Sequence, residues 1–308
     1  PNPATMRSRD EYPNVQREPG FQLAADAQLV AHGDVHVSIL RWNRPAWVTS
    51  HQDQYVWFKN TVLAAYREYG VMVDSINPDA NETSTPEIQL YKDFSSWLRN
   101  DTKGYEGATA DDPNNGFASA EEGELYRAIR TVAADTVGTP PTSFGNALTA
   151  SDSSLRDAVD IVGFHYSSAD DASGNLKKFA EQFDQEVWNS EGQSTFSNSA
   201  DRPNNNAGDE QGGFGTSFGG TNSALEMGNW ITTGFAASRR TLNIFQPAIG
   251  SFYDGFQYSS KELVSARDPW SGWTYYDGGL AVLAQFTQFA TLGWENADNT
   301  AGIWRAIP

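Results

Sequence analysis

Short apolar segments alternate with longer amphipathic segments along most of this chain. Residues 35–40 form a β-branched apolar run that gives way to polar residues, which predicts a buried strand followed by a loop. Between Gln52 and Tyr69 the apolar residues recur at helical spacing, and Gly70 ends that pattern. Residues 71–76 are again short and apolar. Residues 35–76 therefore predict a strand, a helix and a second strand.

The same alternation continues almost to the end of the chain. Helices are predicted at 21–31, 52–69, 86–98, 120–137, 175–183, 224–239 and 279–290. Strands are predicted at 35–40, 71–76, 143–150, 160–166, 186–190 and 242–251, and a surface loop rich in Gly, Asn and Ser at 197–221. Strands that alternate with helices of this length indicate a parallel sheet with crossover helices, either closed into a barrel or doubly wound.

The positions of the polar residues favour a barrel over a nucleotide-binding doubly wound sheet. No GxGxxG or GxxxxGK[ST] turn follows any predicted strand. Polar and aromatic residues instead follow the strands at their C-terminal ends, where a barrel places its active site. They are Trp42, Glu82, Tyr166, Glu191 and Gln246. We expect one catalytic α/β domain, a (β/α)8 barrel, over residues 1–308.

Composition and charge narrow the classes of function. The formal net charge of −18 disfavours nucleic acid and anionic lipid as partners, and no apolar run is long enough to span a membrane. The chain has no Cys, and its four His lack the HExxH spacing, so we expect no metal site. Its 10 Trp and 12 Tyr suit a carbohydrate partner, because flat apolar rings stack on sugars, although aromatic residues are also common in cores.

Two glutamates are candidates for glycoside hydrolysis. Glu82 and Glu191 each end a predicted strand and follow a polar residue, Asn81 or Ser190. Retaining glycosidases use two carboxyl groups ~5 to 5.5 Å apart, one to protonate the leaving oxygen and one to attack the anomeric carbon. With 39 acidic residues in the chain, position alone leaves open that either is an ordinary surface carboxylate.

Several motifs carry a resemblance to a known family. They are RWNRPAW at 41–47, Asn81-Glu82, VDIVGFHY at 159–166, residues 187–191 with Ser194, DPWSG at 268–272 and QFTQ at 285–288. The two glutamates are similar to the acid/base and nucleophile of clan A of the glycoside hydrolases, which end barrel strands four and seven. Within that clan the motifs resemble family 59, the galactocerebrosidase-like β-galactosidases.

The resemblance implies roles for individual residues. Glu82 would be the acid/base and Glu191 the nucleophile, with Tyr166 beside Glu191 and Asn81 at the sugar 2-hydroxyl. Phe245 stands where the family has Trp, which keeps an aromatic platform but loses an indole donor, and the residues around Thr5 differ from the family pattern. The implied substrate-binding residues are Trp42, Asn81, Tyr166, Ser194, Phe245, Trp270 and Thr5. Because His165 and Tyr166 alternate in a strand, we expect Tyr166 to face the pocket and His165 the helices.

Counting strands tests the resemblance and adds an expectation about the whole protein. Glu191 lies three predicted strands after Glu82, as strands four and seven require. Strands one and two would then lie upstream of residue 1, so strands three to eight are expected here. The family's C-terminal β-sandwich is expected beyond residue 308.

The sequence thus predicts a secreted retaining β-glycosidase that needs no cofactor. A β-galactosidase or exo-β-galactanase is the leading interpretation, with a double displacement by Glu191 and Glu82. Other retaining clan A activities (endo-galactanase, xylanase or glucosidase) and a non-catalytic carbohydrate-binding barrel remain open alternatives. The sequence does not fix the oligomeric state.

Overall fold

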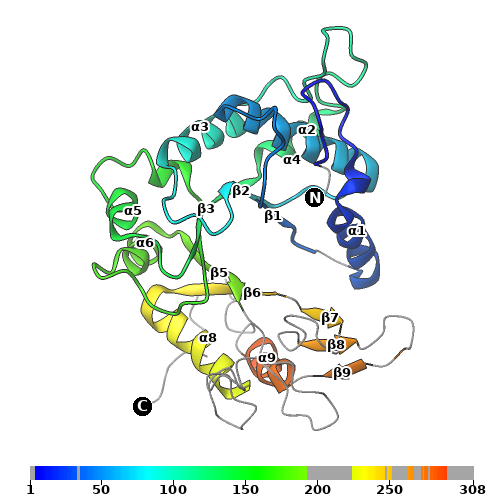
Figure 1. The fold of residues 1–308 in the computed structure, drawn as a ribbon. Coiled ribbons are helices and arrows are strands. Elements are labelled where there is room, and N and C mark those ends of the chain that lie inside the picture. Colours follow the sequence, from blue (N-terminus) through cyan, green and yellow to red (C-terminus); the bar gives the residue numbers. More distant parts are fainter. Residues whose placement is uncertain are drawn as a thin grey trace. The chain divides into compact units, whose positions relative to one another are not determined.

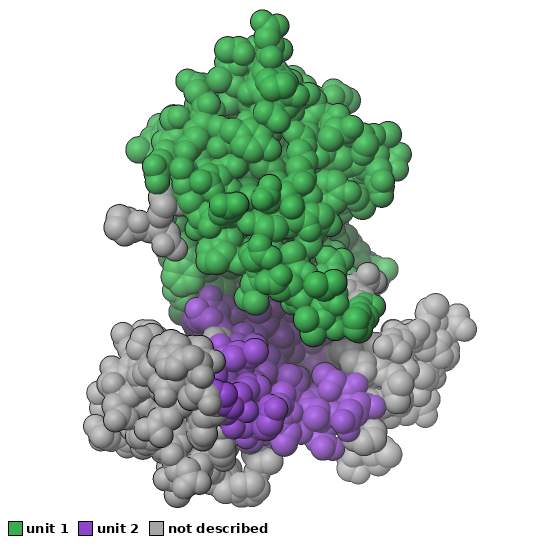
Figure 2. All heavy atoms as spheres, turned by 90° about the vertical axis from the view of Figure 1, so that its right-hand side faces the viewer, with its two compact units in different colours: residues 1–165, 170–187 green, residues 166–169, 188–308 purple. Residues whose placement is uncertain are grey.

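The computed structural model describes residues 4–32, 35–192, 224–246, 248–251, 263–266, 272, 274–276 and 278–289. The chain divides into two compact units, shown in green and purple in Figure 2. Unit 1 comprises Pro1–His165 and Asp170–Val187, and unit 2 comprises Tyr166–Ala169 and Trp188–Pro308.

Unit 1 is built on parallel strands that follow one another in chain order. The strands β1 (Ser38–Arg41), β2 (Ser75–Ala80), β3 (Arg130–Val137) and β4 (Ile161–His165) pair in the order β1-β2-β3-β4. Figure 1 shows them with the helices that connect them. A doubly wound sheet reverses its strand order at a switch point, and these strands do not. The unreversed order is that of an incomplete (β/α)8 barrel.

Helices precede and connect these strands. They are η1 (Val15–Arg17), α1 (Pro19–Ala31), α2 (His51–Tyr69), α3 (Ile88–Arg99), α4 (Ala120–Arg127), α5 (Thr142–Leu148), η2 (Arg156–Ala158) and α6 (Asn175–Phe183). Local signals set the ends of α2: Ser50 and Asp53 form a capping box, and Gly70 ends the helix at φ 72°. The predicted helix at 52–69 is confirmed.

The core of unit 1 lies where the helices pack on the strands. One cluster joins α2 and α3 to β2, with Phe58, Leu63, Ile76 and Phe94 at its centre. A second cluster packs α5 and α6 on β3 and β4, with Phe164 and Phe179 fully buried. Burying such large side chains contributes about 1.5–3 kcal/mol each. The strand ends that carry polar groups are thereby held on a rigid frame.

Two of the predicted elements are wrong. Residues 120–137, expected as one helix, form helix α4 to Arg127 and then strand β3 from Arg130. Residues 143–150, expected as a strand, lie mostly in helix α5. No Gly or Pro separates α4 from β3, and Ala133 and Ala134 favour helix, so the local sequence hides the break. Pairing of β3 with β2 and β4 overrides that local preference.

Strand β2 begins and ends later than the apolar pattern suggested. It spans Ser75–Ala80 rather than 71–76, and its polar residues are buried. The side-chain amide of Asn77 (Nδ2) donates to Asp135 Oδ2 at 2.5 Å, and the hydroxyl of Tyr91 donates to Asp79 Oδ2 at 3.0 Å. These hydrogen bonds offset the desolvation of polar groups, so the strand continues past its last apolar residue.

Unit 2 contains the second half of β5 (Glu186–Gly192), α8 (Ala224–Ser238), β6 (Arg240–Phe245) and α9 (Gly278–Phe289). Its three-stranded sheet consists of β7 (Ile249–Ser251), β8 (Val264–Ala266) and β9 (Thr274–Tyr276), with β7 parallel and β9 antiparallel to β8. The strand predicted at 242–251 is thus two strands, β6 and β7. The predicted loop at 197–221 lies outside the described residues. Within the described part of the chain, every helix is too short or too polar to cross a lipid bilayer.

The spacing of the two candidate glutamates along the strands is confirmed. Glu82 follows β2, and Glu191 lies near the end of β5. The strands β3 and β4 intervene, so β5 is the third strand after β2, even though the intervening strand expected at 143–150 is in fact β3.

Candidate active site

In unit 1 the turn after β2 carries Asn81 and Glu82. The amide of Asn81 donates to Arg41 O at 2.8 Å, and the amide of Glu82 donates to Asp135 O at 2.8 Å. Glu82 has φ 56°, in the left-handed region that non-glycine residues rarely occupy. Its side chain is 38% exposed, and its Oε1 lies 3.4 Å from His165 Nδ1. The backbone of two neighbouring strands therefore fixes this carboxyl group.

Asn81 presents a buried polar atom beside Glu82. Its Oδ1 is buried, and no described residue donates a hydrogen bond to it. A buried acceptor without a donor costs about 1–3 kcal/mol, so such an atom is notable where a ligand hydroxyl could supply the donor. This placement is compatible with the sugar contact expected of Asn81.

Two other predicted contacts in unit 1 have contrasting surroundings. Trp42 follows β1 directly and is 64% exposed, so its indole is available as a platform. Thr5 is buried against α2, where its Oγ1 lies 2.7 Å from Thr61 Oγ1 and accepts a hydrogen bond from Trp57 Nε1 at 3.1 Å. The hydroxyl of Thr5 is thus engaged by α2.

In unit 2 the second glutamate is buried and held by a tyrosine. Glu191 is 7% exposed, and the hydroxyl of Tyr166 donates a hydrogen bond to its Oε1. The amide of Tyr166 also donates to Glu191 O at 3.4 Å. Phe245 ends β6 and is half-buried. The expected placement of Tyr166 beside Glu191 is confirmed, whereas Ser194 and Trp270 lie outside the described residues.

The expectation that His165 faces the helices is wrong. His165, fully buried, contacts Glu82, while the next residue, Tyr166, contacts Glu191. Strand alternation fails at this point because Tyr166 lies beyond the end of β4 with φ 55°. The left-handed backbone of Tyr166 thus breaks the alternation on which the expectation rested.

Two buried charged residues escaped the sequence reasoning. Asp135, in β3, holds the amide of Glu82 and lies 3.6 Å from His165 Nε2. Arg240, at the start of β6, donates to the carbonyl oxygens of Ser167 and Trp230, and burial lowers the pKa of Arg240 to about 10. Asp135 was hidden within an apparent helix. For Arg240, an arginine leading an apolar strand was the only signal.

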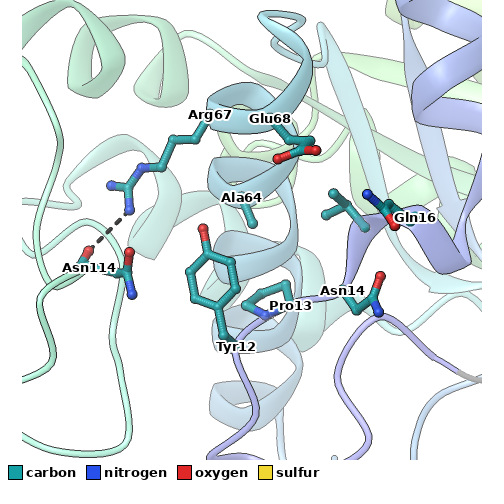
Figure 3. Close-up of a pocket in the computed structure, with 9 residues that line it drawn as sticks. Tyr12, Pro13, Asn14, Gln16, Ala64, Arg67, Glu68 and Asn114 are labelled. Carbon is teal, nitrogen blue, oxygen red and sulfur yellow. Dashed lines mark hydrogen bonds between the residues drawn. The ribbon is translucent and has the colours of Figure 1, made fainter.

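A separate cavity lies in unit 1 between the N-terminal segment and α2. It has a volume of about 530 Å³ and is lined by Tyr12, Pro13, Asn14, Val15, Gln16, Ala64, Arg67, Glu68 and Asn114. Figure 3 shows Arg67 reaching across to Asn114, where its guanidinium donates to the backbone carbonyl at 3.1 Å. Arg67 is also paired with Glu122 at 2.8 Å. None of the predicted site residues lines this cavity.

The fold and these side chains define a class of protein. Parallel strands alternate with helices in chain order, and a glutamate stands at the end of β2 and of β5. In barrels the C-terminal ends of the strands carry the catalytic groups. A pair of carboxylates at such positions is typical of retaining glycoside hydrolases.

Comparison with known proteins identifies the family. The model of Glycosyl hydrolase family 59 matches residues 1–288, so the chain belongs to glycosyl hydrolase family 59. The galactocerebrosidase of Danio rerio is 25% identical over 143 residues, a match that covers 46% of this chain and 17% of the relative. The chain therefore aligns with only part of this longer curated relative.

Solved structures support the fold independently of sequence. The crystal structure of SrfJ from Salmonella typhimurium has a TM-score of 0.58 at 10% identity, and the match covers 90% of this chain and 59% of that one. A family 30 subfamily 8 xylanase from Clostridium acetobutylicum, Xyn30A, has a TM-score of 0.52 at 12% identity, covering 90% and 60%. At this identity the likeness concerns the fold, which is shared with a glycoside hydrolase.

Proposed function

We propose that the protein is a retaining β-glycosidase that removes terminal β-galactosyl residues. Membership of glycosyl hydrolase family 59 supports a glycosidase, and the similarity to proteins named galactocerebrosidase supports galactose as the sugar. A β-galactosidase or an exo-β-galactanase fits both.

The hydrogen bond from Tyr166 to Glu191 is the observation that carries this proposal. A carboxylate that is only 7% exposed is costly to bury unless a donor compensates it. The Tyr166 hydroxyl supplies that donor and orients the carboxylate, because it binds Oε1. A buried carboxylate whose orientation is set by a hydrogen bond is suited to attack on an anomeric carbon. Glu191 is accordingly the nucleophile.

Glu82 takes the complementary role of acid and base. It is more exposed than Glu191. Greater exposure suits an acid/base, because this group exchanges protons first with the leaving group and then with water. Its carboxyl group is nevertheless fixed, through its own backbone and through His165. In the first step Glu82 donates a proton to the glycosidic oxygen while Glu191 forms the glycosyl ester. In the second step Glu82 removes a proton from water, which displaces Glu191 with net retention.

Three further predicted residues would contact the sugar. Asn81 Oδ1, a buried acceptor, would receive a hydrogen bond from the 2-hydroxyl of the bound sugar. Trp42 and Phe245 would offer apolar faces for stacking on the ring. The high negative charge suits a neutral carbohydrate and an extracellular setting, which we include in the proposal.

Hydrolysis of aryl β-glycosides by the full-length protein and three variants tests the proposal. Wild type should release the aryl group from the β-galactoside faster than from the β-glucoside or β-xyloside, with the β-anomer of galactose formed first by NMR. Glu191→Ala should abolish hydrolysis of every substrate. Glu82→Ala should slow hydrolysis of substrates with poor leaving groups by about 10²- to 10⁴-fold, and azide should accelerate it on activated substrates.

Glu124→Gln provides the matched control, because Glu124 is an exposed glutamate on α4 of unit 1. It should retain wild-type rates. Folded full-length protein that binds galactosides but hydrolyses no glycoside would contradict the proposal and favour a carbohydrate-binding barrel. Preference for a glucoside or xyloside would overturn galactose as the proposed sugar. The roles of the two glutamates would then be tested on the preferred substrate.

A further inference from the structure

Strand β3 contains an unusual stretch of backbone. Ala134 and Asp135 both have positive φ, at 77° and 47°, and the register with β4 shifts between Ala134 and Thr136. Left-handed backbone at a non-glycine residue costs roughly 1–2 kcal/mol, and consecutive examples inside a strand are rare. Such strain persists where the surrounding structure requires it, often at functional sites. The strained backbone therefore marks Asp135 as a candidate for a functional role.

The backbone of Asp135 holds the backbone of Glu82. The amide of Glu82 donates to Asp135 O at 2.8 Å, and Glu82 is itself left-handed at φ 56°. Three strained residues, Glu82, Ala134 and Asp135, therefore surround one hydrogen bond. This bond joins the end of β2 to the bulge of β3 and sets the direction in which the side chain of Glu82 leaves the chain.

The side chain of Asp135 leads to the carboxyl group of Glu82 through an imidazole. Its carboxylate is 2% exposed and accepts a hydrogen bond from Asn77 Nδ2 at 2.5 Å. Its Oδ1 lies 3.6 Å from Nε2 of His165, and Nδ1 of the same ring lies 3.4 Å from Oε1 of Glu82. Asn77 and His165 are fully buried. The order Asn77, Asp135, His165, Glu82 forms one chain of polar groups within unit 1.

We propose that Asp135 is a positioning residue for the proton donor, acting through His165 and through its own carbonyl oxygen. Because Oε1 of Glu82 lies against the imidazole, Oε2 is the oxygen left to exchange a proton with the glycosidic oxygen. The carboxylate of Asp135 lies 3.6 Å from Nε2, beyond hydrogen-bonding distance, so it acts on the ring through its charge. This inference rests on the proposed function, because it assigns a role to the acid/base of that reaction.

The leaving group of the substrate separates positioning of the acid from general loss of structure. The 2,4-dinitrophenolate leaving group departs without being protonated. The poor leaving group of a methyl glycoside instead needs a proton from a general acid. Asp135→Asn keeps the shape of the side chain and removes its charge. We expect it to lower kcat/KM for the methyl β-galactoside by about 10- to 100-fold, with less than about a threefold change for the dinitrophenyl β-galactoside. KM for the dinitrophenyl substrate should not rise, because substrate binding is unchanged and a slower second step only lowers KM.

Asp101→Asn is the matched control, because Asp101 is another buried carboxylate of unit 1 that binds Lys59 and Tyr55 rather than the chain to Glu82. Any effect of Asp101→Asn should be equal on the two substrates. If Asp135→Asn fails to fold, His165→Gln takes its place and should show the same selective loss.

An equal loss on both substrates, or no loss on either, would overturn the positioning role of Asp135. Failure of the proposed function would look different, because wild type would then hydrolyse neither galactoside. If wild type prefers another glycoside, the comparison is made with the methyl and dinitrophenyl forms of that sugar, and the same selective loss is expected.

Discussion

Tyr166 contacts Glu191 twice, with its hydroxyl on the carboxylate oxygen Oε1 and with its amide on the backbone carbonyl oxygen at 3.4 Å. Both ends of one residue therefore fix the position of the proposed nucleophile. The left-handed backbone of Tyr166, at φ 55°, makes the double contact possible. The hydroxyl contact can be removed by itself, because phenylalanine keeps the ring and the backbone.

Tyr166→Phe should lower kcat/KM for an aryl β-galactoside by roughly 10- to 100-fold. A hydrogen bond to a charged group contributes about 1.5–3 kcal/mol, and its loss leaves the buried carboxylate of Glu191 less well compensated. Steady-state kinetics checks this, with Tyr12→Phe as a control because Tyr12 is an exposed tyrosine of unit 1. Unchanged kinetics in Tyr166→Phe would mean that the hydroxyl does not support the nucleophile.

His51 should make the stability of unit 1 depend on pH. Its Nδ1 lies 2.8 Å from Asp93 Oδ2 and its Nε2 lies 2.8 Å from Glu87 Oε1, which joins the start of α2 to α3. Partial burial acts to lower the pKa of His51, but the hydrogen bonds to Asp93 and Glu87 outweigh it, so the pKa is raised. The stabilisation is therefore complete below the unfolded pKa of about 6.5 and disappears as the pH rises through the raised folded value.

The variant His51→Gln tests this dependence by urea denaturation at pH 5.5 and pH 8.5. We expect wild type to exceed the variant by about 0.5–1 kcal/mol at pH 5.5, since the pair is partly exposed to solvent, and by less at pH 8.5. A difference that is the same at both pH values would show that the charge on His51 does not contribute.

The free energy of unfolding should fall less when the buried cation Lys59 is replaced than when its partner Asp101 is removed. Lys59 is fully buried, and its Nζ donates to Asp101 at 2.9 Å and to Glu106 at 2.5 Å. Asp101→Ala leaves Glu106, whose side chain is 26% exposed, as the acidic partner of a buried ammonium group, and should cost about 3–5 kcal/mol. Lys59→Met fills the same space, while Asp101 keeps the hydroxyl of Tyr55 as a donor, so we expect about 1–2 kcal/mol. Urea denaturation of both variants checks this order, and a reversed order would contradict the reasoning.

Two glycines should respond to alanine with opposite signs. A Cβ added at Gly20 or Gly70 meets no atom within 4 Å, so packing favours neither substitution. Gly70 ends α2 at φ 72°, where Gly70→Ala should destabilise by about 1 kcal/mol. Gly20 lies in the first turn of α1, where Gly20→Ala should stabilise by about 0.4–1 kcal/mol. Thermal unfolding of both variants checks the signs, and a shared sign would refute the role given to φ.

The sequence predicted those parts of the fold whose signals are local. Helix α2 has its apolar face, its capping residues and its terminal glycine within one segment, and the structure follows that pattern. Glu82 and Glu191 were selected for a related reason, since each follows, within a few residues, a short apolar run that predicted a strand, although β2 itself begins only at Ser75. Strand-end glutamates are visible without knowledge of what lies beside them.

The parts that the sequence did not reveal depend on pairing between distant segments. Nothing near Arg130 marks the change from helix to strand, because the pairing with β2 and β4 decides it. The role of Asp135 depends on a bulge, and the contact of Tyr166 with Glu191 depends on the left-handed backbone of Tyr166. Both depart from the regular alternation on which strand predictions rest, so no count along the chain could have placed these side chains.

The bulge in β3 also bears on how the protein tolerates length variation. One extra residue between Ala134 and Thr136 is accommodated there, and the pairing of Val137 with His165 resumes beyond it. Deleting the extra residue, Asp135, would restore regular pairing of β3 with β4 and would remove the carbonyl oxygen that holds the amide of Glu82. Insertions in this protein family are therefore expected in the loops after the strands, and a designer who grafts new loops for a different sugar should begin the graft after Val137.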